Sequence, residues 1–172
     1  MTRLFTILTI LTFTSCRQSS EITNKTCISG DTKNLNLKPF ELTVHDEDYS
    51  MAYALQYVLT DKDLKIIFKG ELEGEKDSTL FKTTLQPSEI LSKLSNINID
   101  SLHEHYSNPC IKDGSQVTVK LNKDNKTKTV HLSNYYQADI GLAIELINSL
   151  TPKKYKIWYD KIILIKDQEN CK

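Results

Sequence analysis

MAYALQYVLTDKDLKIIFKG, residues 51–70, is the stretch that decides the fold class. Large apolar side chains occupy every second position of 51–60, and a second alternation runs through 64–68. A period of two residues is typical of a strand that buries one face. The charged residues 61–63 interrupt the pattern, so we predict a turn there and an antiparallel hairpin around it.

Other parts of the chain carry the same alternation. An acidic loop with two glycines, GELEGEKD (70–77), follows the hairpin, and the polar stretch 122–126 separates two later alternating runs. These patterns predict a third strand after the acidic loop and a second hairpin around 122–126. The further strands expected are 42–44, 79–85, 117–121 and 130–132.

Helical spacing is clearest in 140–150, where the apolar positions form one stripe that ends before Pro152. A second helix is expected over 90–97, because Pro87 stands where a helix can begin without losing a useful N–H group. Ser101 and Glu104 have the spacing of a capping box, which predicts a short helix over 101–107. The apolar runs 157–159 and 162–165 are interpreted as a final strand.

Along the chain, the predicted elements are first strands, then helices, then a hairpin and a final helix. This order lacks the strand–helix–strand alternation of a parallel sheet. This order favours an α+β fold, with an antiparallel sheet covered on one face by helices. We expect one globular domain over residues 40–172, a size that supports one hydrophobic core.

The N-terminal residues have the layout of a secretory signal. Arg3 precedes a mostly apolar core, Leu4 to Phe13, and two small residues precede Cys16. Ten residues rise about 15 Å as a helix, half of a bilayer core, so they are too short to span it. Residues 1–15 are therefore expected to be a signal peptide, and the polar residues 16–39 a flexible tether.

Phe13-Thr14-Ser15-Cys16 resembles the lipobox of bacterial lipoproteins, although that family prefers leucine at the first position. The resemblance implies that the Cys16 thiol receives a diacylglycerol, that the bond before it is cut, and that acyl chains such as palmitate anchor the protein. Arg17 stands where members retained in the inner membrane often carry aspartate. The resemblance thus implies the outer membrane, on its periplasmic or surface side.

Residues 50–150 also resemble, loosely, an uncharacterised domain family of small bacterial envelope lipoproteins. The segments that carry this resemblance are GSQVTVKLN, KTVHLSNYY and AIELINSL. It implies a fold and a location in the cell envelope, and it brings no active site with it.

Three further cysteines, Cys27, Cys110 and Cys171, are too far apart for a CxxC motif. Outside the inner membrane disulfides persist, so one pair and one odd thiol are expected. We favour Cys110 with Cys171, because both flank patterned segments whereas Cys27 lies in the tether. The alternative is that all three are reduced.

The charges balance, with 22 Lys and Arg against 22 Asp and Glu, so no overall field points to nucleic acid. Five glycines argue against a glycine-rich phosphate loop. GxSxG and SxxK motifs are absent from the sequence. We therefore expect neither an enzyme nor a cofactor.

His103 and His105 with Cys110 form the one cluster with metal-ligand residue types. In the predicted helix, residues two apart point in different directions, so both imidazoles could not face one ion. We interpret the histidines as solvated and expect no metal. A metal-dependent protein that uses these three residues stays as an alternative.

Aromatic residues flank the helix predicted at 140–150. Tyr and Trp combine large apolar area with a polar group and are favoured at interfaces. The alternative is that these rings close the core beneath the helix. The candidate binding surface consists of Tyr135, Tyr136, Trp158 and Tyr159.

Together these features favour a lipid-anchored, non-enzymatic binding or structural domain of the bacterial envelope. Its expected partners are the membrane, through the N-terminal lipid, and an unidentified protein or envelope component. A second hypothesis is that the chain is an immunity or inhibitor lipoprotein that blocks a toxin or a hydrolase.

Overall fold

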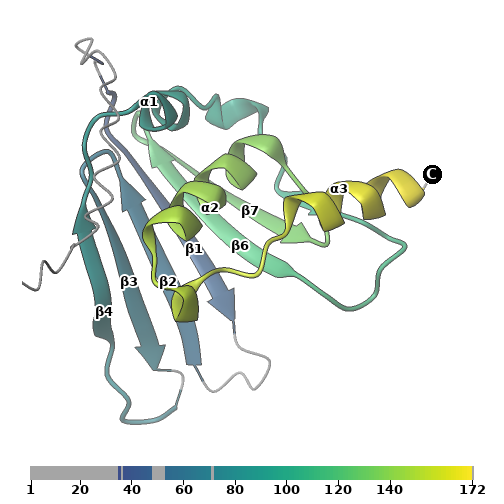
Figure 1. Ribbon diagram of the computed structural model, residues 1–172, viewed down its shortest axis with the longest axis horizontal. Helices are drawn as coiled ribbons and strands as arrows, with labels where there is room; N and C mark the ends of the chain where they lie inside the picture. The colour runs from purple at the N-terminus through teal and green to yellow at the C-terminus, as the bar shows by residue number, and fades with distance from the viewer. Residues whose placement is uncertain (1–34, 36, 48–52, 71, 172) are drawn as a thin grey trace, which may run out of the picture. The chain divides into compact units, whose positions relative to one another are not determined.

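The computed structural model describes residues 35, 37–47, 53–70 and 72–171. In this part of the chain one sheet has the strand order β4-β3-β2-β1-β6-β7-β5 (Figure 1). Neighbouring strands are antiparallel, except β5 and β7, which are parallel. The strands are β1 (Phe40–Glu47), β2 (Tyr53–Thr60), β3 (Asp63–Gly70), β4 (Ser78–Thr84), β5 (His105–Ser107), β6 (Gln116–Lys123) and β7 (Lys126–Ser133).

Three α-helices complete the described part of the domain, and the predicted α+β class is confirmed. Helix α2 crosses one face of the sheet, and α3 follows it at the end of the chain (Figure 1). The helices are α1 (Glu89–Ser95), α2 (Ala138–Leu150) and α3 (Lys161–Asn170), with the short 3₁₀ turns η1 (Ile99–Ser101) and η2 (Lys153–Tyr155).

Both predicted hairpins are confirmed. In the first, Leu59 pairs with Leu64, and the Thr60 hydroxyl oxygen accepts the Asp63 N–H at 2.9 Å to close the turn. In the second, Asp124 and Asn125 have φ values of 51° and 60°. Two left-handed residues in a two-residue loop match the right-handed twist of the strands that they join.

The core lies between one face of the sheet and α2. The helix buries four positions of the stripe expected from its sequence, with Ile144 fully buried at its centre, and the last position, Leu150, is half-buried. Strand β1 is central to the sheet and longer than the expected 42–44, because it pairs with β2 on one side and β6 on the other. The fully buried Tyr57 donates its hydroxyl hydrogen to the Tyr155 carbonyl at 2.9 Å, which ties η2 to the sheet.

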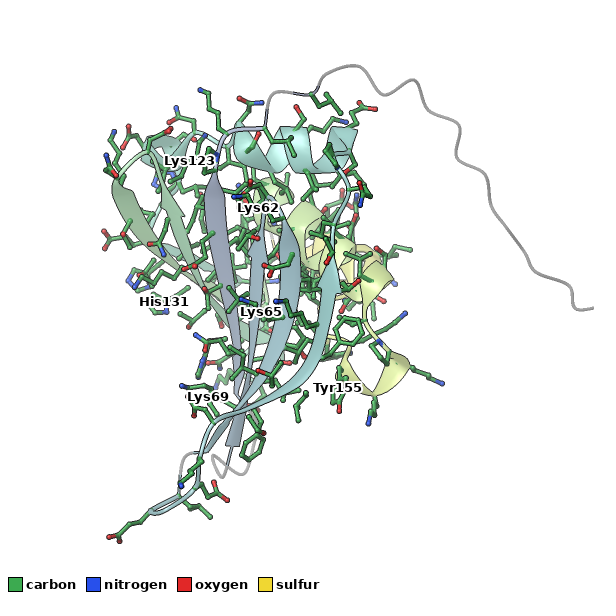
Figure 2. The ribbon with its side chains drawn as sticks, turned by 90° about the vertical axis from the view of Figure 1, so that its left-hand side faces the viewer. Lys62, Lys65, Lys69, Lys123, His131 and Tyr155 are labelled. Carbon is green, nitrogen blue, oxygen red and sulfur yellow. A yellow bond between two sulfur atoms is a disulfide. The ribbon has the colours of Figure 1, made fainter. Side chains whose placement is uncertain are left out.

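The opposite face of the sheet, called the outer face here, is mainly polar, although Val58 and Ile67 also lie on it. It carries the side chains that alternate with the buried ones along each strand. Figure 2 shows Lys65, Lys69 and His131 on this face, away from α2 and α3. The prediction that the helices pack on one face of the sheet is therefore confirmed.

The prediction of a helix over 101–107 is wrong. The chain instead forms η1, whose cap is Asn98, and then the edge strand β5. Ser101 does not cap a helix, because its hydroxyl donates to the Asn98 carbonyl at 2.7 Å. Pairing with β7 holds this segment extended, since the His131 N–H donates to the Glu104 carbonyl at 2.7 Å.

The final strand predicted for 157–159 and 162–165 is also wrong. Residues 161–170 form α3, and the Asp160 side chain caps it by accepting the N–H groups of Ile162 and Ile163 at 2.9 and 3.0 Å. An aspartate at this position satisfies two of the backbone donors that a helix leaves free at its start.

The signal predicted at 1–15, Cys16, Cys27 and most of the tether lie outside the described residues. Among the residues that are described, no helix combines the length and the apolar character needed to cross a bilayer.

Candidate binding groove beside the disulfide

A disulfide joins Cys110 to Cys171, with 5.7 Å between their Cα atoms. The pairing preferred from the sequence is therefore present. It fastens the end of α3 to the segment that follows β5. The side-chain oxygen of Asn108 supports that segment by accepting the Cys110 N–H at 3.1 Å.

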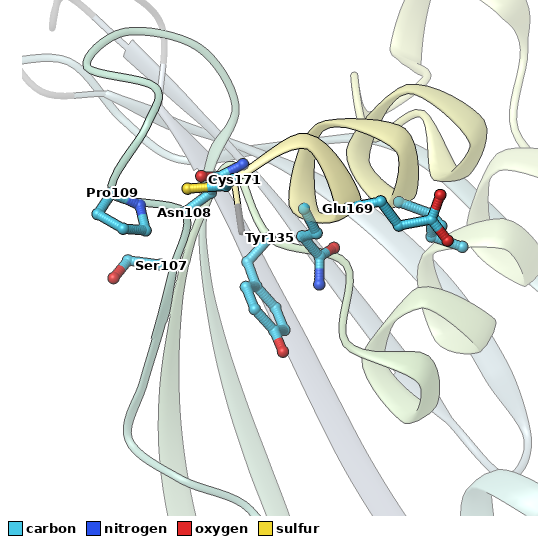
Figure 3. A pocket seen from close by; sticks show the side chains of 8 residues that line it. Ser107, Asn108, Pro109, Tyr135, Glu169 and Cys171 are labelled. Atoms are coloured by element: carbon cyan, nitrogen blue, oxygen red, sulfur yellow. The ribbon is translucent and has the colours of Figure 1, made fainter.

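An open groove of about 390 Å³ lies next to this disulfide. One wall is the segment 107–109, and the other is the face of α3 that carries Ile165, Gln168 and Glu169. The Tyr135 ring lies between the two walls, with Cys171 at one end (Figure 3). The groove exists because the disulfide and the β5–β7 pairing bring three distant segments together.

Tyr135 is held in place by its backbone and by its ring, whose centre lies 5.4 Å from that of Tyr106. The residue before it, Asn134, has φ 51° and donates its N–H to the Ser115 carbonyl at 2.8 Å. The Asn134 side chain fills the space at Gly114, where an added Cβ would lie 2.2 Å from the amide oxygen. Gly114 itself has φ 140°, so a side chain there would be strained as well as obstructed. The turn before Tyr135 therefore depends on glycine at 114.

Tyr159, one of the four candidate aromatic residues, supports the groove from beneath. It is buried, its hydroxyl donates to the Tyr135 carbonyl at 2.8 Å, and its oxygen accepts the Gln137 N–H at 3.1 Å. Burial raises the pKa of the Tyr159 phenol to about 12. The phenol therefore stays protonated at neutral pH and keeps the hydrogen that it donates to Tyr135.

Tyr136 has a packing role against α2. Its ring lies over Gly141, where an added Cβ would come within 2.4 Å of the ring. Its hydroxyl donates to Glu145 at 3.2 Å, and the Lys161 ammonium lies 5.3 Å from the ring centre. Its backbone N–H donates to the Gln168 side-chain oxygen at 2.6 Å, which fixes one wall of the groove.

Trp158 is placed differently from the three tyrosines. It is 63% exposed and lies with Ile163 in a small hollow that Asp113 and Asp167 also line. None of these residues lines the groove beside Tyr135. The four aromatic residues thus divide into one groove residue, two supporting residues and one exposed residue, and do not form one continuous surface.

The polar groups of the groove are suited to hydrogen bonding. The side-chain nitrogen of Asn108 is buried and has no acceptor among the described residues. Pro109, Ile165 and the Tyr135 ring supply apolar contact, and Glu169 supplies an exposed carboxylate. Apolar walls with a few polar groups are typical of binding sites for small ligands and peptide segments.

Sequence reasoning found Tyr135 and Cys171 but missed the α3 wall. The missed residues are Ile165, Gln168 and Glu169, because this segment was interpreted partly as a strand. The available signal was Asp160, an N-cap residue type placed directly before the segment.

The suggested metal cluster is not assembled. Cys110 is bonded to Cys171, so its sulfur is not available as a thiolate. The His103 ring lies edge-on to Tyr106, whereas the His105 ring stacks on His131. Within the described part of the chain, no three His, Cys, Asp or Glu side chains are grouped closely enough to hold a metal ion.

Comparison of the chain with known proteins found no relative. No protein-family model, no curated protein and no solved structure matches this chain.

Proposed function

We propose that the chain is a lipid-anchored domain of the bacterial envelope that binds a partner through the groove beside Tyr135. The anchor is Cys16, which follows an apolar segment and two small residues in the manner of a lipobox. The observation that carries the location is the disulfide between Cys110 and Cys171. Disulfides persist in the periplasm and on cell surfaces and are rare in the cytosol. The disulfide therefore supports a location outside the cytoplasm, the same location that the predicted signal peptide implies.

Replacing Cys16 with serine is expected to release the protein from the membrane. The thiol is the proposed attachment point of the diacylglycerol, and acyl chains supply the binding energy for a stable anchor. The measurement is fractionation of cells grown with labelled palmitate. The wild type should be labelled and sediment with membranes, and Cys16→Ser should be unlabelled.

Cys27→Ser is the matched control, since it removes a cysteine from the same N-terminal region. It should keep both label and membrane attachment. Equal labelling of Cys16→Ser and wild type would contradict the lipid anchor.

The binding role rests on the groove. It combines an aromatic ring, an aliphatic wall and the exposed carboxylate of Glu169, apolar area with a polar group of the kind that can hold part of a protein partner. Its rim is the end of the edge strand β5. Glu104 and Asn108 form backbone hydrogen bonds with β7, and in a parallel ladder only alternate residues do so, so the backbone groups of His105 and Ser107 point away from β7. An extended segment of a partner could bond to this edge and place a side chain against Tyr135.

A photoreactive amino acid at Ser107, on the rim of the groove, is expected to cross-link a discrete partner in living cells. Adding Tyr135→Ala should weaken this product at least about fivefold, because truncating an aromatic residue at the centre of an interface costs more than 1 kcal/mol. The readout is the intensity of the cross-linked band, followed by mass spectrometry of the partner.

Trp158→Ala is the control, because Trp158 is more exposed than Tyr135 but lies outside the groove. It should leave the Ser107 product unchanged. A product that disappears with Trp158→Ala and survives Tyr135→Ala would move the binding surface to the hollow around Trp158.

A further inference from the structure

Three of the chain's four histidines lie in one row across the outer face of the sheet. His45 pairs with Thr118, Thr118 pairs with His131, and His131 pairs with His105. The row is on the outer face because Val119, next to Thr118 in β6, is buried on the opposite face. The histidines are far apart in the sequence, and the strand order brings them together.

His131 and His105 are direct neighbours in this row. Their ring centres are 5.0 Å apart, the rings are inclined by 15°, and both side chains are exposed. A neutral imidazole nitrogen is the commonest protein ligand for divalent transition metals. Two such nitrogens from adjacent strands can therefore serve as a pair of ligands.

Thr118 prepares one of the two rings for this role. Its hydroxyl oxygen is 3.1 Å from Nδ1 of His131. When that oxygen accepts the hydrogen on Nδ1, the lone pair of the ring lies on Nε2. A hydrogen bond to the second ring nitrogen is the usual outer partner of a metal-bound histidine, because it fixes the tautomer and the ring orientation.

Most residues around the pair are neutral. The next outer-face residues on the same two strands are Thr129, Ser133 and Ser107, and the nearest charged residue of this face on β6 is Lys120, which pairs with Thr129. Zinc lies about 2.1 Å from each nitrogen, which requires the nitrogens to approach to roughly 3.3 Å. The two exposed rings must therefore lean toward each other, and exposed side chains rotate readily.

We propose that His105 and His131 form a surface site for a divalent transition-metal ion of the zinc class. One nitrogen of each ring binds the ion, water completes the coordination, and Thr118 is a positioning residue. Neither histidine lines the groove beside Tyr135, although the backbone of His105 belongs to its β5 rim, and the site does not rest on the proposed function. With two protein ligands, its affinity is lower than that of a closed structural site with four.

The test is a Zn²⁺ titration of the purified full-length chain, in detergent, with isotope-labelled histidine. Each of the four imidazoles gives its own NMR signals, assigned by single His→Asn variants. We expect Zn²⁺ to shift the signals of His105 and His131 together, with a single midpoint. His131→Asn should weaken the shift of His105 at least about tenfold in midpoint, since half of the protein ligands are lost.

His103→Asn is the matched control, because His103 lies two residues from His105 but packs against Tyr106 outside the row. His45→Asn is a second control, because Thr118 lies between His45 and His131. Neither control should change the midpoint of the Zn²⁺ titration by more than about twofold. Equal shifts of all four histidines, or a His105 shift that survives His131→Asn, would overturn the site.

Thr118→Val tests the positioning role with little change in shape. It should raise the midpoint about tenfold, the lower end of the effect of an outer partner, while Thr118→Ser should restore it. An unchanged midpoint in Thr118→Val would contradict the role assigned to Thr118.

Discussion

Replacing Cys171 with serine is expected to lower the free energy of unfolding by about 4 kcal/mol. The disulfide closes a loop with a sequence separation of 61 residues, and the chain-entropy estimate for a loop of that size is about 4 kcal/mol. The bond also fastens α3, of which Leu164 is the one residue buried in the core. The measurement is urea unfolding of the variant and the wild type under oxidising conditions.

The Cys110→Ser/Cys171→Ser double variant separates the loss of the bond from the creation of a free thiol. It should have the same stability as the single variant, because either change removes the same cross-link. Cys27→Ser should behave as wild type. A single variant that unfolds at the wild-type urea concentration would mean that α3 is held by its other contacts, among them the hydrogen bond between Gln168 and Tyr136.

Truncating Ile144 to alanine is expected to cost about 2–5 kcal/mol of stability, the range for emptying a buried isoleucine site. Ile144 is fully buried at the centre of the α2 stripe, against a sheet face that includes Val119 and Val130. The adjacent Glu145 is exposed and makes its contacts with Tyr136 and Lys161 at the surface. Glu145→Gln keeps an acceptor there and should cost less than about 1 kcal/mol.

Denaturant unfolding of these two variants compares the buried and exposed sides of one helix. A large difference between them is the expected result. Equal costs at 144 and 145 would contradict the packing of α2 on the sheet.

Local periodicity was sufficient to predict the two hairpins and α2. In each, the buried residues recur at the period of the element itself, so the pattern records the packing. Strand β5 has only three residues, too few to show a periodic pattern. It pairs with β7, and the first two paired residues, His105 and His131, are 26 residues apart in the sequence. The capping-box spacing of Ser101 and Glu104 indicated a helix there. The pairing of β5 with β7 holds the segment extended instead.

Helix α3 was missed for a related reason. Ile162, Ile163 and Ile165 form a β-branched run that suits a strand, and only Leu164 is buried, so no apolar stripe marks a helix. Its position depends on the Asp160 cap and on the disulfide. The groove needs α3, β5 and Tyr135 together, so the sequence pointed to two of its residues, Tyr135 and Cys171, and not to its shape.

We propose that the mature protein begins at a lipid-modified Cys16. Intact mass spectrometry of the chain extracted from native membranes tests this directly. We expect a protein that starts at Cys16, lacks residues 1–15 and carries the added mass of a thioether-linked diacylglycerol, with or without an N-acyl chain. A membrane-derived protein that retains Met1, or that starts elsewhere and carries no lipid, would contradict it.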